Sequence, residues 1–340
     1  MSVKQFPIGM IGAGAIAVSR HLPNLQKIEG VEFVAVANRN LESSRKVAEA
    51  FGFAKVYEHW KEVVDDPEVR IIFNCTPPYM HKEISCYALA KGKHVFCQAR
   101  MAMNLAEAEE MLEADRSTEL TTMLCPPPTY MAVEPFVMQY MEDGHLGDIR
   151  HIVLHHATSS LNDADKPLHW RQRSDLQGIN LLDVGIMGEV LNRWFGPVSH
   201  LSAIGKTWVT ERPADRDGRS MVELPDSVTV IGQFKTGATL TALFTGAAAA
   251  DACSLTIHGS KGTLRCMAGE PYVALQTSEG ERRIDIPEEL LGKWEVEKQF
   301  LQSVADGKKG APSFEEGVRY MRFTQAITDS MAQGMRPVQL

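Results

Sequence analysis

The feature that most constrains the fold is a glycine-rich turn near the start of the chain. An apolar run over residues 6–11 leads into Gly12-Ala13-Gly14-Ala15-Ile16-Ala17, and a helical pattern follows. This G-x-G-x-x-A spacing between a strand and a helix is typical of dinucleotide-binding domains. Gly12 allows a tight turn, Gly14 lets a pyrophosphate approach the backbone, and Ala17 permits close helix–strand packing. We therefore expect the helix to begin at a phosphate-binding site that includes Ala15 and Ile16. The alternative is a glycine-rich turn without a ligand.

Strand and helix patterns alternate over the first 125 residues. Near-continuous apolar strands that alternate with helices predict a parallel sheet covered on both faces. The expected strands cover residues 6–11, 31–37, 69–75, 94–97 and 120–125, and the expected helices cover 15–25, 41–51, 80–91 and 105–117. Residues 1–125 are therefore predicted to form a Rossmann-type domain.

Three consecutive prolines at 126–128 mark a change of pattern. Proline continues neither a helix nor a central strand, so a domain boundary is expected there. Beyond a helix at 135–142, β-branched stretches joined by short turns predict antiparallel strands. These stretches cover 149–156, 199–208, 227–234, 238–245, 254–258, 262–266 and 272–276, with further helices at 179–195, 295–305 and 314–333. We expect an α/β protein in which residues 126–340 form an α+β domain with a large, mostly antiparallel open sheet.

Composition and charge exclude several functions. The chain of 340 residues carries a formal net charge of -8 and has no dense run of Lys and Arg, which disfavours nucleic acids and anionic membranes as partners. Its six cysteines form no C-x-x-C pair or zinc-spaced cluster, so no metal is predicted. Residues 1–7 lack the pattern of a secretion signal and no apolar run is long enough to span a membrane. A cytoplasmic location is therefore expected.

The end of the second strand bears on cofactor choice. An acidic residue about 20 residues beyond the glycine turn binds the ribose of NAD. Here Asn38 and Arg39 occupy that position. A guanidinium group can pair with a 2′-phosphate that a carboxylate would repel. NADP is therefore favoured over NAD, which remains the alternative, as does a solvated loop position for Arg39.

Several further segments resemble one family. They are Thr76-Pro77-Pro78-Tyr79-Met80-His81, residues 92–104, residues 142–149, Leu182-Asp183-Val184-Gly185 and residues 258–264. With the glycine turn, their order is similar to that of the glucose-fructose oxidoreductase / inositol dehydrogenase / rhizopine-catabolism (Gfo/Idh/MocA) family. The resemblance implies NAD(P)-dependent oxidation or reduction of a sugar, polyol or related ring. It also implies a homodimer or homotetramer formed through the open sheet.

The chain departs from two motifs of that family. Where the family typically has Glu-Lys-Pro, with a Lys that transfers a proton and orients the nicotinamide, this chain has Gln98-Ala99-Arg100. Met187 stands where the resemblance predicts a His, four residues after Asp183. Both usual proton-transfer groups are therefore absent, although general acid–base catalysis contributes roughly 10²–10⁴-fold to such reactions.

Other residues are candidates for the missing roles. Asp183 is the first choice as a catalytic or substrate-binding carboxylate, with helix capping as its alternative. His169 is titratable and lies beside Trp170, which suits a polyol pocket, with a surface position as its alternative. The resemblance adds Tyr130 as a proton donor, with core packing as its alternative. His155-His156, on a predicted strand, can place one imidazole in the pocket and is the weakest candidate.

The resemblance also implies contacts with the cofactor and substrate. Cofactor contacts are expected from Thr76, Pro77, His81 and Gln98. Substrate contacts are expected from Arg100, Trp170, Arg171 and Met187. The guanidinium of Arg100 can bind a carboxylate or phosphate in bidentate fashion, but it is a poor base.

Three functions are consistent with these features. The leading one is an NAD(P)-dependent oxidoreductase of a sugar-like or cyclic polyol or carbonyl compound, with hydride transfer in the cleft between the domains. The second is a redox-neutral lyase or glycosidase that keeps NAD bound. The third is a non-catalytic sensor or regulator that binds the dinucleotide, an interpretation motivated by the absence of both the Lys and the His.

Overall fold

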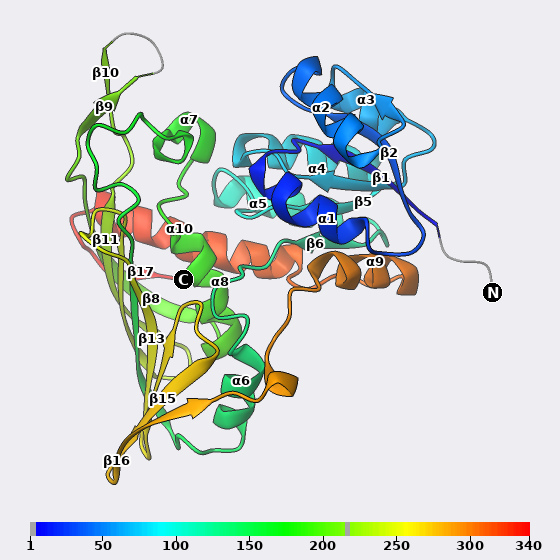
Figure 1. The fold of residues 1–340 in the computed structure, drawn as a ribbon. Helices are drawn as coiled ribbons and strands as arrows, with labels where there is room; N and C mark the ends of the chain where they lie inside the picture. Colours follow the sequence, from blue (N-terminus) through cyan, green and yellow to red (C-terminus); the bar gives the residue numbers. More distant parts are fainter. Residues whose placement is uncertain (1–4, 215–217) are drawn as a thin grey trace. The chain divides into compact units, whose positions relative to one another are not determined.

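A computed structural model describes residues 5–214 and 218–340, so residues 1–4 of the amino-terminal stretch 1–7 lie outside it. The chain forms two units (Figure 1). The first comprises the residues up to Pro126 together with Glu295–Met321, and the second comprises Pro127–Trp294 and Arg322–Leu340. The first boundary, between Pro126 and Pro127, lies one residue from the expected division between 125 and 126. The expected division did not include the return of Glu295–Met321 to the first unit.

The first unit contains a six-stranded parallel sheet in the order β3-β2-β1-β4-β5-β6. Its parallel strands and intervening helices confirm the predicted Rossmann fold. The strands are β1 (Phe6–Ile11), β2 (Val31–Ala37), β3 (Lys55–Val56), β4 (Ile71–Asn74), β5 (His94–Cys97) and β6 (Thr122–Leu124). The helices are η1 (Ala17–His21), α1 (Leu22–Leu25), α2 (Leu41–Phe51), α3 (Trp60–Asp65), η2 (Pro78–Met80), α4 (His81–Ala90), α5 (Leu105–Arg116) and α9 (Val296–Asp306).

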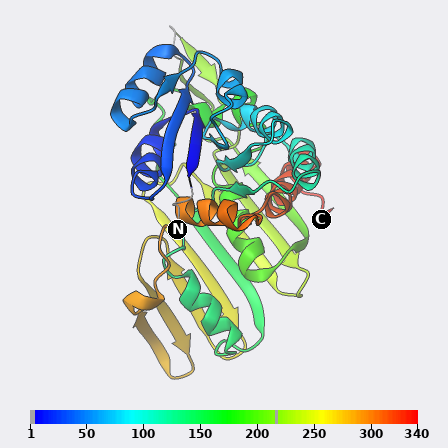
Figure 2. The same ribbon diagram turned by 90° about the vertical axis from the view of Figure 1, so that its right-hand side faces the viewer.

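Helices lie on both faces of this sheet (Figure 2). Helix α4 contacts α3 and α5, whereas α1 contacts α9. Helix α9 packs against the sheet through Phe300, whose ring centroid lies 5.5 Å from those of both Phe73 on β4 and Phe96 on β5. These contacts explain why a segment so distant in sequence completes the first unit.

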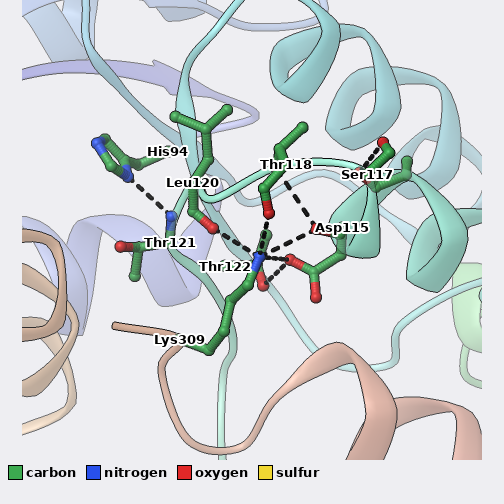
Figure 3. Close-up of polar contacts among 9 residues, drawn as sticks. His94, Asp115, Ser117, Thr118, Leu120, Thr121, Thr122 and Lys309 are labelled. Carbon is green, nitrogen blue, oxygen red and sulfur yellow. Dashed lines mark hydrogen bonds and ion pairs between the residues drawn. The ribbon is translucent and has the colours of Figure 1, made fainter. Parts of the chain in front are cut away.

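Lys309 makes a second connection between this late segment and the Rossmann strands. Its ammonium group donates to the Asp115 carboxylate at 2.7 Å and to the carbonyl oxygens of Asp115, Thr118 and Leu120 at 2.8–3.1 Å (Figure 3). The same carboxylate accepts a 2.7 Å hydrogen bond from Thr122 of β6. The cation thus ties the end of α5 and the segment between α5 and β6 to the segment that follows α9.

The second unit contains a nine-stranded sheet in the order β16-β15-β14-β13-β7-β12-β11-β8-β17. All neighbouring strands are antiparallel except β7 and β12, which confirms the predicted large, mostly antiparallel sheet. The strands are β7 (Ile149–Ala157), β8 (Val198–Lys206), β11 (Ser227–Phe234), β12 (Thr239–Thr245), β13 (Ala252–Gly259), β14 (Thr263–Met267), β15 (Tyr272–Thr277), β16 (Gly280–Asp285) and β17 (Val338–Gln339).

Helices cover one face of this sheet, and α6 and α8 lie on that side in Figure 1. Apolar side chains of α6, α8 and α10 pack with those of the strands in one core. The helices are α6 (Glu134–Glu142), η3 (Trp170–Gln172), α7 (Ser174–Gln177), α8 (Val184–Phe195) and η4 (Glu288–Leu290), and a small hairpin pairs β9 (Glu211–Pro213) with β10 (Arg219–Met221). Helix α10 (Phe314–Ala332) belongs to the first unit up to Met321 and to the second unit from Arg322. Within residues 5–214 and 218–340, no helix has the length and apolar character needed to cross a membrane.

One predicted helix begins later than expected. The sequence pattern places its start at 179, whereas α8 begins at Val184. Leu182 adopts a φ of 42°, a left-handed conformation that a regular helix does not continue through. Asp183 therefore lies at the N-cap position, directly before the helix, rather than in its interior, and its side chain makes no capping hydrogen bond there.

Candidate functional site

The glycine-rich turn has the geometry of a phosphate-binding loop. Gly12 has a φ of 78°, and a Cβ there would lie within 2.7–2.8 Å of Thr76, so only glycine fits. At Gly14 a Cβ would meet only the Gly12 carbonyl oxygen, at 3.9 Å. The space beside Gly14 is therefore open to a ligand rather than filled by the protein. Ala17 is buried, as close packing between the helix and the sheet requires.

The helix that follows this turn offers backbone amide groups to an anion. Residues 15–25 are helical, and Ala15 and Ile16 of the first turn are exposed. The first amide groups of a helix have no partner within it and carry its positive dipole end. The loop and the helix start thus fit the pyrophosphate of a dinucleotide.

The end of β2 supports this turn directly. The Asn38 side-chain oxygen accepts a 2.6 Å hydrogen bond from the backbone amide of Ala13, and the backbone amide of Asn38 donates to the Ser44 hydroxyl at 2.8 Å. The neighbouring Arg39 is exposed. A neutral side chain and a cation, rather than a carboxylate, therefore stand where a ribose or its 2′-phosphate is recognised.

The residues after β4 and β5 are joined by a buried histidine. His81 is fully buried, and its ring nitrogens contact the Thr76 carbonyl oxygen at 2.6 Å and the Arg100 carbonyl oxygen at 2.8 Å. Burial lowers the His81 pKa, which the hydrogen bonds to the two carbonyl groups oppose. We assign His81 the role of holding these two backbone segments, because its ring nitrogens are occupied by protein atoms.

The other residues expected at the cofactor end lie beside this histidine. Thr76 donates its hydroxyl hydrogen to Asn74 at 2.7 Å, and Pro77 is half-buried. Gln98 and Ala99 are also half-buried, whereas Arg100 is buried. The Ala99–Arg100 peptide bond is cis. The chain departs from the family motif at the three consecutive residues Gln98, Ala99 and Arg100. Of their side chains, that of Arg100 is buried in the protein.

In the second unit, the main polar feature is a histidine–carboxylate pair. His156 Nε2 lies 3.0 Å from Asp183 Oδ2. The two side chains come from the end of β7 and the start of α8. The His156 side chain is 10% exposed, whereas that of Asp183 is 46% exposed, so the carboxylate is the member that a substrate can reach.

This pairing follows from the local structure of both elements. Along β7, alternate residues Ile152, Leu154 and His156 face the covered side of the sheet, which places His155 on the other side. The left-handed turn at Leu182 brings Asp183 to the helix start. The sequence singled out Asp183 first and ranked the His155-His156 pair last. The alternation along β7 was the signal that could have selected His156.

The segment that precedes α7 carries the other expected polar residues. His169 Nδ1 accepts a hydrogen bond from the Arg171 amide at 3.2 Å, which leaves Nε2 as the protonated nitrogen of the neutral ring. Burial and the nearby Arg171 guanidinium lower the His169 pKa. Arg171 lies over the Trp170 ring at 4.7 Å and is attracted by the Asp183 carboxylate. This segment therefore holds the Arg171 cation, stacked on Trp170, within electrostatic range of Asp183.

Two residues expected at the site lie in the core of the second unit. Tyr130 is 3% exposed and its ring centroid lies 6.2 Å from that of Trp194. Burial raises the Tyr130 pKa strongly, which disfavours ionisation of its hydroxyl group. Met187 is fully buried in the same core. Packing is the role that their surroundings give to both side chains.

Within the described part of the chain, no three His, Cys, Asp or Glu residues are grouped to hold a metal ion. The second unit offers a carboxylate supported by an imidazole, and the first unit carries the glycine-rich loop.

Comparisons with known proteins agree with this description. Residues 6–124 match the model of an oxidoreductase family with an NAD-binding Rossmann fold, and residues 136–265 match the model of the GFO/IDH/MocA C-terminal domain. The levoglucosan dehydrogenase of Pseudarthrobacter phenanthrenivorans is 24% identical, over 88% of this chain and 87% of its own length. The trans-1,2-dihydrobenzene-1,2-diol dehydrogenase of Mus musculus is 28% identical over 65% of each chain.

Solved structures show the same fold. A levoglucosan dehydrogenase in complex with NADH and levoglucosan superimposes with a TM-score of 0.86 at 21% identity, over 99% of both chains. An aldose-aldose oxidoreductase from Caulobacter crescentus, complexed with glycerol, gives a TM-score of 0.80 at 21% identity, over 99% of this chain and 100% of its own.

Proposed function

This chain belongs to the Gfo/Idh/MocA family of oxidoreductases, and from that premise we propose that it is an NAD(P)-dependent dehydrogenase or reductase. The proposed reaction interconverts a CH–OH group and a carbonyl group on a sugar-like or cyclic polyol substrate. The observation that carries the proposal is the 3.0 Å contact between His156 and Asp183, because it supplies a proton-transfer pair in a chain whose usual Lys and His positions hold Ala99 and Met187. The relatives that act on levoglucosan and on a diol support this substrate class.

Asp183 is the proposed proton acceptor for alcohol oxidation. Hydride exchange is the chemistry that the dinucleotide supplies when bound. As a hydride leaves the carbon, the hydroxyl proton must leave the oxygen, and the exposed Asp183 carboxylate can accept it. His156 donates to the same carboxylate and orients it, so the pair takes up one proton as a unit. In the reductive direction the same proton returns to the carbonyl oxygen.

We assign the cofactor as NADP in preference to NAD. Asn38 adds no negative charge near the expected ribose, because its side chain is neutral and its oxygen accepts from Ala13. Arg39 is exposed on the same loop and can pair with a 2′-phosphate. Both features favour the phosphorylated cofactor.

The proposed assembly is a homodimer or homotetramer that pairs through the open sheet. Ile204 on β8 and Ile231 on β11 lie on the uncovered face and are 50% and 57% exposed. Exposed apolar side chains grouped on a sheet favour association. Light scattering of the purified chain measures the assembly directly, and a monomeric mass would contradict it.

The function is tested by following nicotinamide absorbance with a panel of anhydrosugars, aldoses, inositols and cyclic diols. The proposal expects steady-state turnover with at least one of them and its loss in Asp183→Asn. Product formed without a net change in absorbance would instead identify a redox-neutral enzyme. Dinucleotide binding without turnover of any compound would identify a sensor.

A further inference from the structure

Three side chains form a buried chain of hydrogen bonds in the first unit. Glu297 Oε1 lies 2.6 Å from His21 Nδ1, and His21 Nε2 lies 2.9 Å from Gln98 Nε2. The Gln98 side-chain oxygen accepts a 3.1 Å hydrogen bond from the Ala99 amide. His21 and Glu297 are 0% and 1% exposed, whereas Gln98 is half-buried. This Glu297–His21–Gln98 chain therefore runs from α9, through the helix after the glycine turn, to the end of β5.

The donors and acceptors fix the protonation state of the imidazole. The Ala99 amide can only donate, so the Gln98 atom that it contacts is the oxygen. The other Gln98 atom is then the amide nitrogen, which can only donate, so His21 Nε2 accepts. The ring proton is consequently on Nδ1 and is donated to Glu297. Asn24 donates a further hydrogen bond to the same carboxylate at 3.3 Å.

The Gln98 end of this chain of hydrogen bonds lies where the nicotinamide half of a dinucleotide belongs. In the sheet order, β4 and β5 follow β1 on the side opposite β2. A dinucleotide crosses the carboxyl ends of the strands at this reversal of strand order, with one ribose recognised at the end of β2. The other half then lies over the ends of β4 and β5, where Gln98 and Ala99 follow the last residue of β5.

We propose that the Glu297–His21–Gln98 chain is a positioning device that fixes the Gln98–Ala99 peptide for binding of the nicotinamide end of the cofactor. The proposal rests on the function proposed above. Ala99 has no functional side chain, so this peptide can contribute only backbone groups, whose direction must be set by neighbours. His21 sets one end through Gln98, and His81 holds the following carbonyl group of Arg100.

Gln98→Ala tests the positioning role, with Gln26→Ala as the matched control. Gln26 is an exposed glutamine that directly follows α1. Fluorescence titration with NADPH and NADH is expected to give a dissociation constant roughly 3–10-fold higher in Gln98→Ala, as loss of one neutral hydrogen bond implies. The control should match the wild-type chain, and the melting temperatures of both variants should remain close to it.

Gln98→Glu supplies a readout that a purely structural role would not change. A carboxylate at this position faces the lone pair of His21 Nε2 and must share a proton with it. Between pH 5.5 and pH 8, the dissociation constant for the cofactor is therefore expected to change in Gln98→Glu by a factor roughly tenfold larger than in the wild-type chain. An affinity profile parallel to that of the wild type would overturn the role assigned to Gln98.

The protonation state of His21 is tested without any cofactor. The ¹⁵N shifts of the ring nitrogens, assigned by their loss in His21→Gln, are expected to show a protonated Nδ1 and an unprotonated Nε2. A proton on Nε2 would overturn the hydrogen-bond chain whatever the function. If the wild-type chain binds neither dinucleotide, the proposed function fails and the cofactor role fails with it. Normal binding with an unchanged dissociation constant in Gln98→Ala overturns the positioning role alone.

Discussion

His156 Nε2 and Asp183 Oδ2 lie 3.0 Å apart, although the two residues are 27 positions apart in the sequence. His156 lies near the end of a strand, and Asp183 directly precedes a helix. The buried imidazole stands behind a half-exposed carboxylate. A carboxylate that receives a hydrogen bond from a fixed donor is held in one orientation, which is the first requirement of a general base. The proton transfer that we propose therefore relies on a pair within the second unit rather than on positions 99 and 187.

Removal of the Asp183 carboxylate is expected to abolish most of the turnover. Asp183→Asn keeps the size of the side chain but cannot accept a substrate proton, so kcat should fall roughly 10²–10⁴-fold. The dissociation constant for NADPH should stay within about twofold, because the dinucleotide loop belongs to the first unit. Asp285→Asn, at an exposed carboxylate on β16, is the matched control. Turnover at the wild-type rate in Asp183→Asn would remove Asp183 from the reaction.

Replacement of His156 is expected to change the pH profile more than the affinity for substrate. His156→Gln can still donate to Asp183 but does not titrate, so the carboxylate would take up its proton alone. We expect kcat to fall about tenfold and the acidic limb of the kcat profile to move, with KM little changed. A lower kcat with an unmoved profile would mean that His156 only supports the packing of β7.

The loop after β2 is expected to decide between NADP and NAD. Asn38→Asp combined with Arg39→Ala keeps an oxygen that accepts from Ala13, removes a cation and adds a carboxylate. We expect NADPH to bind at least tenfold more weakly and NADH to bind more tightly. Arg45→Ala, at an exposed arginine on α2, is the control. An unaltered ratio of the two dissociation constants would show that Asn38 and Arg39 do not contact the ribose.

The local patterns predicted the Rossmann unit well because each of its signals lies within a few residues. Gly12 and Gly14 are adjacent to their strand and helix, and Gly52 ends α2 in the left-handed conformation that glycine adopts readily. Helix α3 was missed because it has only six residues and its apolar face is correspondingly short. Strand β3 has two residues, which is too few to give a periodic pattern.

The contacts that complete each unit were beyond the reach of sequence periodicity. His21 meets Glu297 across 276 positions, and Phe300 packs on the first sheet from a helix that sequence order assigns to the second domain. The pairing of His156 with Asp183 depends on which face of β7 is covered and on the turn at Leu182. Such contacts are set by tertiary packing, which overrides the order of the elements along the chain.

The Lys309 contact is expected to stabilise the first unit. Lys309→Met removes the cation from the buried Asp115 carboxylate and from three carbonyl oxygens (Figure 3). The free energy of unfolding should fall by about 1–3 kcal/mol, because the partners that remain are incompletely hydrogen-bonded. Lys308→Met, at the exposed neighbouring lysine, should leave it within about 0.5 kcal/mol. Equal urea midpoints for the two variants would show that the contact contributes nothing to stability.

Acidification is expected to destabilise the same region through His94. Its Nδ1 accepts a 2.9 Å hydrogen bond from the Thr121 amide, which only an unprotonated nitrogen can do (Figure 3). Burial, reinforced by the Lys309 charge, lowers the His94 pKa below its usual value of 6.5. A histidine whose pKa is lower in the folded chain contributes stability above its unfolded-state pKa, and that stability is lost as the pH falls below about 6.5.

His94→Gln separates this contribution from those of the other titrating groups. A glutamine oxygen can accept from the Thr121 amide, but it takes up no proton in this range. Urea unfolding at pH 7.5 and at pH 5.5 should therefore show a smaller loss of stability in His94→Gln than in the wild-type chain. Equal losses would mean that His94 has the same proton affinity in the folded and unfolded chains, and that its hydrogen bond to Thr121 does not resist protonation.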